Sequence, residues 1–230
     1  MNDKQTSRLS PIANLNANSL LINEIFLSIQ GESSYAGQLC VFVRTTACNL
    51  RCSYCDTQYA FFNGEQLSLP NIIEQIDQFG VSLVEITGGE PLLQPAVFEL
   101  TKTLCNKGHT VLLETNGTVE VQNVDPRAIK IIDIKTPGSG EEKNNLYSNI
   151  AKLQPKDEVK FVLTTKEDYD WAKNTINHYQ LFNRCQILMS AAFGYLTPNQ
   201  LAEWIVADRI PVRMQLQLHK YIWDPHKEGV

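Results

Sequence analysis

This chain has little positive charge and no long apolar segment. Its 230 residues include 20 Lys and Arg against 25 Asp and Glu, so the formal net charge is −5. That balance argues against a nonspecific nucleic-acid surface, because such surfaces need positive charge. No apolar run approaches the roughly 20 residues that a bilayer-spanning helix needs. We therefore expect neither nucleic acid nor a membrane as a partner.

Secretion signals, repeats and linkers are also missing. Residues 1–18 are polar and rich in Asn, and they lack the apolar centre of a secretory signal. No internal repeat occurs and no linker divides the chain, and α/β barrels reach this length as one domain. We predict a flexible N-terminal arm over residues 1–18 and a single domain over residues 19–230.

Cysteine is scarce but clustered. Three of the six cysteines, Cys48, Cys52 and Cys55, fall within eight residues. A disulfide would use two of them and leave one over. The missing signal and the clustering favour a reducing compartment, so we expect a cytoplasmic protein.

The simplest use of all three clustered thiols is to hold one metal centre. Thiolates are standard ligands for zinc and for iron–sulfur clusters. A structural zinc site would need a fourth ligand, but Cys105 and Cys185 are distant and the four His are scattered. A four-iron cluster on three thiolates leaves one iron open to a substrate or cofactor. An iron–sulfur enzyme is thus favoured, and a zinc-stabilised binding domain is the alternative.

The rest of the chain alternates predicted strands with predicted helices. Apolar alternation and short apolar runs mark the strands, while apolar stripes with Pro at the start and Gly at the end mark the helices. The predicted strands are 20–26, 39–45, 81–86, 110–113, 129–134, 158–163, 185–189 and 212–219. The predicted helices are 67–80, 95–107, 167–179 and one that starts from a capping box at Thr197–Gln200. This alternation implies an α/β fold with a parallel sheet and helical crossovers.

Polar segments follow the predicted strands where each strand ends. Catalytic groups of α/β barrels lie at the C-terminal ends of the strands, so these segments are expected to meet at one face. They are the cysteine loop, Gly88-Gly89, Glu114-Thr115-Asn116, Asp133-Ile134-Lys135 and His219 at the end of the predicted last strand. We therefore predict an active site built from these segments.

Arg44 occupies a strand face that it shares with Cys40 and Phe42. Burying an unpaired guanidinium is costly, so Arg44 needs an anionic partner. Glu24, Glu32 or a substrate carboxylate could supply it.

Asp56 and Thr57 follow the last clustered cysteine. A hydroxyl beside a carboxylate could ligate a hard cation such as Mg²⁺, which takes oxygen ligands. The alternative is a capping turn formed by the same two side chains.

Several motifs together resemble the 7-carboxy-7-deazaguanine synthases, a family of radical S-adenosylmethionine (SAM) enzymes. Cys-x3-Cys-x2-Cys with an aromatic residue, Tyr54, before the third cysteine is the hallmark of the superfamily. The remaining motifs are residues 28–32 (SIQGE), 42–44 (FVR), 55–57 (CDT), 86–91 (ITGGEP), 114–117 (ETNG) and 218–221 (LHKY). The match runs from about residue 22 to the last residue. The resemblance implies an incomplete, modified (β/α) radical SAM barrel.

The resemblance also implies a reaction. Members of the family contract the ring of 6-carboxy-5,6,7,8-tetrahydropterin to give 7-carboxy-7-deazaguanine and ammonia, a lyase step toward queuosine and other 7-deazapurines. The implied cofactors are a [4Fe-4S] cluster, SAM and Mg²⁺. The implied partners are a flavodoxin or ferredoxin reductant and a second copy of the chain in a homodimer. Another radical SAM enzyme, such as a glycyl-radical activase, would share the cysteine loop and the Gly-Gly-Glu-Pro turn, and is the alternative.

Residue roles follow from the same resemblance. Cys48, Cys52 and Cys55 would ligate the cluster that generates the radical, and Thr57 would ligate Mg²⁺. The residues implied for substrate are Ile29, Gln30, Gly31, Arg44, Thr87 and His219. Those implied for SAM are Tyr54, Cys55, Asp56, Gly89, Asp133, Ile134 and Lys135. Because radical chemistry must be shielded from solvent, a lid formed by the C-terminal residues is expected.

Overall fold

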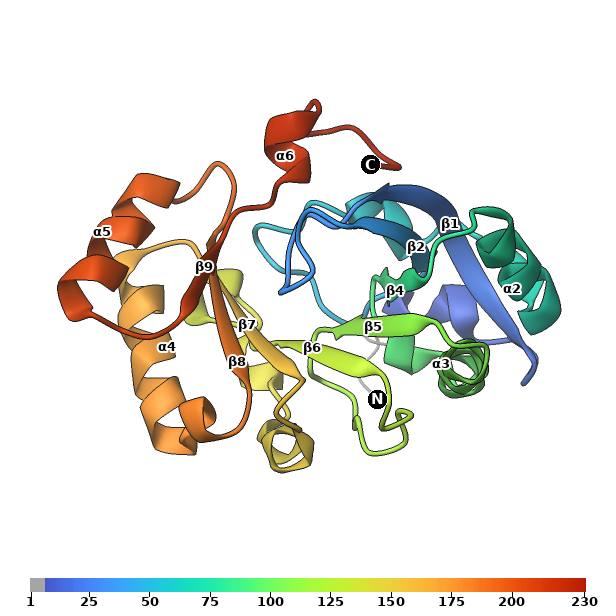
Figure 1. Cartoon of the computed structure of the whole chain (residues 1–230), viewed down its shortest axis with the longest axis horizontal. Coiled ribbons are helices and arrows are strands. Elements are labelled where there is room, and N and C mark those ends of the chain that lie inside the picture. The colour runs from blue at the N-terminus through green and yellow to red at the C-terminus, as the bar shows by residue number, and fades with distance from the viewer. Residues whose placement is uncertain (1–6) are drawn as a thin grey trace.

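One nine-stranded sheet runs through the computed structural model, which describes residues 7–230 (Figure 1). Its spatial order is β3-β1-β2-β4-β5-β6-β7-β8-β9. The strands are β1 (Ser19–Ile29), β2 (Leu39–Thr45), β3 (Glu65–Ser68), β4 (Leu83–Gly88), β5 (Thr110–Thr115), β6 (Ile129–Asp133), β7 (Glu158–Leu163), β8 (Gln186–Ala191) and β9 (Arg213–Gln215). β1 pairs antiparallel with β2 and β3, and every other neighbouring pair is parallel.

Helices supply most of the crossovers that parallel strands require. They are α2 (Leu69–Gln78), α3 (Ala96–Asn106), α4 (Lys166–Tyr179), α5 (Pro198–Asp208) and the short α6 (His219–Ile222). Figure 1 shows α2 and α3 beside one end of the curved sheet and α4 and α5 beside the other. Among the helices of residues 7–230, none has both the length and the apolar character needed to cross a membrane.

Local sequence explains where the helices begin. The Ser68 side chain accepts a hydrogen bond from the Asn71 N–H, and Pro70 occupies the first turn of α2. At α5 the predicted capping box is present, with Thr197 and Gln200 bonded to each other's backbone N–H. Each cap satisfies backbone donors that the first helical turn leaves free.

The main core lies between the sheet and its helices, and a second apolar cluster lies on the other face of the sheet. Ile72 and Ile76 of α2, Leu100 of α3 and Tyr169 of α4 are fully buried in the main core. Because side chains alternate along a strand, the same strands also present the second cluster. It consists of Cys40, Phe42, Leu83, Leu112, Ile129 and Ile131.

The predicted fold is confirmed, an α/β architecture with a mostly parallel sheet. The predicted strands 39–45 and 158–163 coincide with β2 and β7. Within residues 7–230 the edge strands β3 and β9 do not pair with each other, so the barrel is incomplete. Cys105 and Cys185 pack against the main core, as a structural role requires.

Several predicted boundaries differ from the structure by a few residues, and two of the differences change the type of element. β3 falls partly inside the predicted helix 67–80, where a polar and mostly exposed segment pairs with the start of β1. The predicted strand 212–219 ends at Gln215, and His219 begins α6 instead of ending a strand. The chain leaves the sheet because Leu218 has helical backbone angles and donates its N–H to the Gly31 carbonyl at 3.1 Å.

Part of the predicted N-terminal arm lies against the cysteine loop. Residues 1–6 fall outside the described residues. Ser10–Ile12 forms a 3-10 helix, and Arg8 Nη1 donates to the Asn49 carbonyl at 2.8 Å. Arg8 also lies 3.7 Å from Glu141 Oε1. The flexibility of residues 1–18 stays a prediction.

Candidate active site

A single cavity of about 640 Å³ opens at the carboxyl ends of the parallel strands. It brings together nearly all the residues that the sequence singled out. Those lining it are Ile29, Gln30, Gly31, Arg44, Cys48, Cys52, Tyr54, Cys55, Asp56, Thr57, Thr87, Gly89, Asp133, Lys135 and His219. Ile134 is the exception, since its side chain is buried in the main core.

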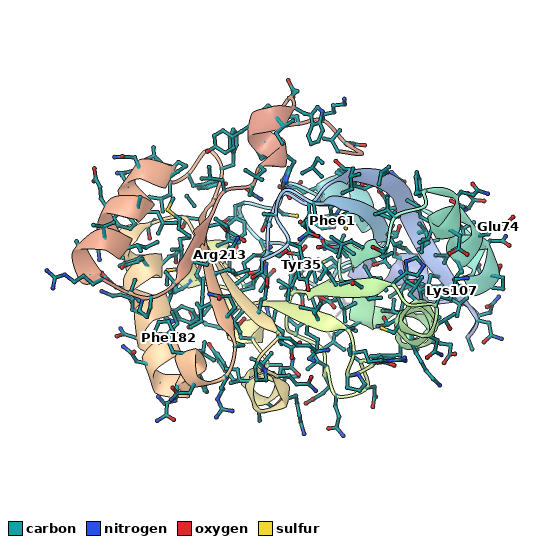
Figure 2. The ribbon with its side chains drawn as sticks, viewed as in Figure 1. Tyr35, Phe61, Glu74, Lys107, Phe182 and Arg213 are labelled. Carbon is teal, nitrogen blue, oxygen red and sulfur yellow. The ribbon has the colours of Figure 1, made fainter. Side chains whose placement is uncertain are left out.

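The cysteine loop follows β2 and folds back on itself. Arg51 Nη1 donates to the carbonyls of Cys48 and Leu50, at 2.8 and 2.6 Å. Its guanidinium stacks 3.9 Å from the ring of Phe61, a favourable cation–π distance. Phe61 is labelled in the interior of Figure 2, between the two groups of helices. These contacts fix the first half of the loop.

The turn after β6 forms hydrogen bonds with the cysteine loop on both sides of Cys52. Ser53 donates its N–H to the Ser139 carbonyl at 3.0 Å and its hydroxyl to the Gly138 carbonyl at 2.7 Å. On the other side, the Arg51 N–H donates to Glu141 Oε1 at 2.6 Å. The residues before and after Cys52 are therefore held by the same segment, 138–141.

Asp168, at the start of α4, anchors that segment. Its buried carboxylate accepts from the Gly138 N–H at 2.7 Å and from both the N–H and the hydroxyl of Thr164, at 2.9 and 2.7 Å. A Cβ on Gly138 would lie 2.1 Å from Thr164 Oγ1, so only glycine permits this approach. Asp168 thus positions the cysteine loop through Gly138 and Ser53.

We expect Asp168→Ala to lower the free energy of unfolding by about 2–4 kcal/mol, because it leaves buried donors unsatisfied. The loosened turn should also release Ser53, which we expect to appear as faster amide hydrogen exchange in the cysteine loop. Asp170→Ala, on the exposed side of the same helix, is the matched control and should change neither quantity appreciably. Unchanged exchange at Ser53 in Asp168→Ala would show that the loop does not depend on this anchor.

Gly88 and Gly89 let the end of β4 lie directly against the cysteine loop. A Cβ on Gly89 would lie 2.2 Å from the Ala47 carbonyl oxygen, and one on Gly88 would lie 2.3 Å from Thr45 Oγ1. The Gly89 N–H donates to the Thr45 carbonyl and the Glu90 N–H to the Ala47 carbonyl, at 3.0 and 2.8 Å. The close approach explains the two adjacent glycines.

Glu90 joins this turn to the segment that follows β5. Its buried carboxylate accepts from the Leu92 N–H, the Thr115 hydroxyl and the Asn116 N–H, at 3.0, 2.7 and 2.6 Å. Burial raises the pKa of Glu90 to about 7. Asn116 Nδ2 lies 3.6 Å from Cys48 Sγ, so the segment after β5 contacts the first of the clustered thiols.

The three clustered thiols are suited to a multinuclear centre. Within residues 7–230, no three His, Cys, Asp or Glu side chains converge on a single metal ion. A four-iron cluster takes one thiolate per iron and does not require such convergence. Burial raises the pKa of Cys48 to about 11 and that of Cys52 to about 12, and a bound metal would displace these protons.

Comparisons with known proteins show the family of the chain. The Radical SAM superfamily model matches residues 42–133. The 7-carboxy-7-deazaguanine synthase of Chlorobaculum tepidum is 48% identical over 214 residues, which cover 92% of this chain and 97% of that protein. The chain belongs to the 7-carboxy-7-deazaguanine synthase family. The enzyme of the same name from Koribacter versatilis is 40% identical over 91% of this chain and 99% of its own length.

Solved structures show the same fold. The crystal structure of QueE from Escherichia coli superposes with a TM-score of 0.71 at 22% identity, covering 86% of this chain and 94% of that one. The structure of TYW1 with a lysine–pyruvate adduct has a TM-score of 0.55 at 14% identity, covering 73% and 72% of the two chains. Membership of the synthase family makes this chain a radical SAM enzyme, which implies a [4Fe-4S] cluster and SAM. It excludes the zinc-stabilised binding domain.

Arg44 forms an ion pair with Glu24. Its Nε donates to Glu24 Oε1 at 2.7 Å, and the Tyr59 hydroxyl donates to the same oxygen at 2.8 Å. Of the two carboxylates considered from the sequence, Glu24 is therefore the one that pairs. No hydrogen bond from the described residues reaches the two terminal nitrogens of Arg44, so this end of the guanidinium is available to a ligand.

A charge network that the sequence analysis missed lines the cavity around the buried side chains of Lys160 and Glu85. Lys160 of β7 bonds to Glu114 and lies 2.9 Å from Glu32 Oε2. Gln30 donates its side-chain amide to Glu85 of β4. Burial, reinforced by the charge of Glu114, raises the pKa of Glu85 well above its usual value. The signal was present, because Glu85 and Lys160 each interrupt an apolar strand and a buried charge needs a partner.

The C-terminal segment closes one side of the cavity. The residues of this segment that line it are His219, Lys220 and residues 225–230. A Cβ on Gly31 would lie 2.5 Å from His219 Nδ1, so this glycine makes room for the imidazole. Burial lowers the pKa of His219 below its usual value. Lys220 Nζ lies 3.0 Å from Asp56 Oδ2 and fastens the segment to the cysteine loop.

Unpaired buried polar atoms mark the side of the cavity predicted to hold SAM. Lys135 Nζ lies 2.6 Å from Asp133 Oδ2 and 5.7 Å from the centre of the Tyr54 ring. Among the described residues, neither the Tyr54 hydroxyl nor Asp133 Oδ1 has a hydrogen-bond partner. Buried polar atoms without partners are costly, so their presence here fits a site that takes a polar ligand.

Thr57 and Asp56 form the local contact considered as an alternative to a cation site. The Thr57 hydroxyl donates to Asp56 Oδ1 at 2.9 Å. Burial alone would raise the pKa of Asp56, but the ammonium of Lys220 lowers it below its usual value. Both residues line the cavity, and the Mg²⁺ role of Thr57 stays a prediction.

Proposed function

We propose that this chain converts 6-carboxy-5,6,7,8-tetrahydropterin to 7-carboxy-7-deazaguanine with release of ammonia, a lyase step in the pathway to queuosine and other 7-deazapurines. The 48% identity to a 7-carboxy-7-deazaguanine synthase over 97% of its length supports this activity. The observation that carries the proposal is one cavity that is lined both by the three clustered thiols and by Arg44. None of the described residues forms a hydrogen bond with the two terminal nitrogens of Arg44, so they are open to a ligand.

Cys48, Cys52 and Cys55 would ligate the [4Fe-4S] cluster and leave its fourth iron to SAM. When bound, the cluster and SAM supply a one-electron route to a carbon-centred radical. On the wall beside the thiols, Lys135 and the Tyr54 hydroxyl can donate to SAM, while Asp133 Oδ1 can accept from it. The full set of residues assigned to SAM is Tyr54, Cys55, Asp56, Gly89, Asp133, Ile134 and Lys135.

Arg44 and its neighbours in the cavity would hold the pterin. Arg44 has two terminal nitrogens that can meet the substrate carboxylate, while Glu24 and the rings of Phe26 and Tyr59 keep the guanidinium in place. Ile29, Gln30, Gly31, Thr87 and His219 complete the residues assigned to substrate. The C-terminal segment would exclude water from the bound radical.

A magnesium ion would sit beside Thr57. Mg²⁺ prefers oxygen ligands and usually keeps waters and substrate oxygens in its shell. The Thr57 hydroxyl lines the cavity and would exchange its bond to Asp56 for one to the cation. Substrate oxygens and water would supply the remaining ligands.

Three further features follow from the same proposal. A flavodoxin or ferredoxin would deliver the electron, and two copies of the chain would form a homodimer. The cytoplasm suits the chain, because all six cysteines are free thiols and an iron–sulfur cluster needs a reducing environment. These partners and this compartment belong to the proposal.

A product assay tests the activity. Anaerobically reconstituted protein, given SAM, a reductant, Mg²⁺ and the tetrahydropterin, should release 7-carboxy-7-deazaguanine and ammonia. Omission of SAM, and separately of the reductant, should abolish the product. SAM cleavage without any deazaguanine would instead indicate another radical SAM enzyme, such as a glycyl-radical activase.

A further inference from the structure

Cys48 differs from the other two clustered cysteines in its hydrogen bonding. Its Sγ accepts from the Leu50 backbone N–H at 3.4 Å and from Asn116 Nδ2 at 3.6 Å. Among the described residues, no side chain donates a hydrogen bond to the sulfur of Cys52 or Cys55. One side chain of the fold is therefore aimed at one thiol of the three.

The orientation of the Asn116 amide is fixed by its neighbours. Its Oδ1 accepts from the Thr118 N–H at 3.0 Å and from the Thr118 hydroxyl at 2.7 Å. Since a backbone N–H can only donate, the carbonyl end must face Thr118 and the NH₂ end must face Cys48. Asn49 Oδ1 accepts the second amide hydrogen at 3.0 Å.

The backbone of Asn116 is held as firmly as its side chain. Its N–H donates to the buried carboxylate of Glu90 at 2.6 Å, and only 7% of the residue is exposed. A side chain held by so many partners is positioned before any ligand arrives. The bonds of Asn116 to Glu90, Asn49 and Thr118 are sufficient to hold the turn together. The additional N–H directed at the Cys48 sulfur is not needed for that packing role.

We propose that Asn116 raises the reduction potential of the cluster through its hydrogen bond to the Cys48 sulfur. This inference rests on the proposed function, which places the cluster on Cys48, Cys52 and Cys55. Hydrogen bonds to the sulfurs are one of the factors that set the potentials of iron–sulfur clusters. One-electron reduction adds a negative charge, and an N–H dipole directed at a ligating sulfur stabilises that charge. With Asn116 in place, the cluster would therefore accept an electron more readily.

Two variants separate this role from a purely structural one. Asn116→Ala removes the N–H donor, and Asn116→Asp keeps the shape and the acceptor for Thr118 while placing an oxygen near sulfur. Asn149→Ala is the matched control, because this buried asparagine supports the same turn through Gly117 and Val119 without touching Cys48. Iron and sulfide content and the thermal midpoint should be measured on each protein.

The deciding measurement is a redox titration of the reduced-cluster EPR signal, with neither substrate nor SAM present. We expect a more negative midpoint potential in Asn116→Ala, a still more negative one in Asn116→Asp, and no shift in Asn149→Ala. Unshifted potentials in clusters of full occupancy would overturn the inference. The inference would also be overturned if both Asn116 variants lost the cluster while Asn149→Ala kept it, because Asn116 would then have a structural role in holding the cluster. A wild-type protein that holds no cluster would overturn the proposed function itself.

Discussion

Arg44→Ala is expected to reduce deazaguanine formation by about 100-fold or more while leaving the cluster intact. Truncating one partner of a desolvated charge pair typically costs 2–5 kcal/mol, and Arg44 would meet the pterin carboxylate with nitrogens that no described residue occupies. Cleavage of SAM in the absence of substrate should continue, because Arg44 is assigned to the pterin and not to SAM. Iron and sulfide analysis, substrate-free SAM cleavage and product formation measure the three quantities separately.

Two further variants separate the contributions of the planar pair of donor nitrogens of Arg44, its positive charge and its support by Glu24. Arg44→Lys keeps the positive charge but loses the planar pair of donors, so it should recover only part of the activity. Glu24→Gln leaves the guanidinium in place and weakens its support, so a smaller loss is expected. If Arg44→Ala emptied the cysteine loop of iron, Arg44 would be a residue of the cluster site, contrary to its assignment.

Gly89→Ala should remove more than half of the bound iron and lower turnover at least 100-fold. The added methyl would lie 2.2 Å from the Ala47 oxygen and 2.6 Å from the Ala47 carbonyl carbon. Both are backbone atoms, which cannot swing aside like the end of a flexible side chain, so overpacking must shift the cysteine loop or the end of β4. Iron content per chain and product formation report the displacement.

Gly80→Ala is the matched control for this substitution. Gly80 follows α2 just beyond its C-cap with a φ of +64°, and a Cβ there would meet nothing within 4 Å. The cost is then about 1 kcal/mol of backbone strain, with full iron content and normal turnover expected. Full iron content in Gly89→Ala would show that the loop tolerates the crowding.

The residues that carry chemistry were predictable where they follow a strand. Asp133 and Thr87 lie at the carboxyl ends of apolar strands and the cysteine loop follows another, and parallel strands bring their carboxyl ends to one face. Their meeting in one cavity was therefore implied by chain order alone. Their individual ligand roles rest on the family resemblance, because spacing does not distinguish a SAM contact from a substrate contact.

Partners that are remote in sequence were not predictable. Lys160 visibly interrupts the apolar strand 158–163, but its contact with Glu32 joins residues 128 positions apart, so the partner could not be identified. Glu24 was one of the anions considered for Arg44 from the sequence, but only the antiparallel register of β1 and β2, which places it opposite Arg44, selects it over Glu32. Asp168 occupies the first turn of α4, where acidic residues are common, and its link to Gly138 depends on how α4 packs against the turn after β6.

The end of the sheet shows the limit of periodicity. Residues 212–219 alternate in polarity, yet only Arg213–Gln215 form a strand. Gln215 and Gln217 both donate to the half-buried carboxylate of Glu32, at 3.1 and 3.0 Å, so the two polar side chains share a partner although the strand ends at Gln215. The departure of the chain at Leu218 then brings His219 over Gly31.

The hydrogen bonds from segment 138–141 to Arg51 and Ser53 have a consequence for how the cluster is inserted into the protein. Zinc fingers fold only when metal arrives, because their small cores cannot order the ligands. Here carbonyls and a carboxylate from segment 138–141 order the residues on either side of Cys52 by protein contacts alone. Iron and sulfide can then be loaded into a finished scaffold, so chelation should strip the metal reversibly without unfolding the polypeptide.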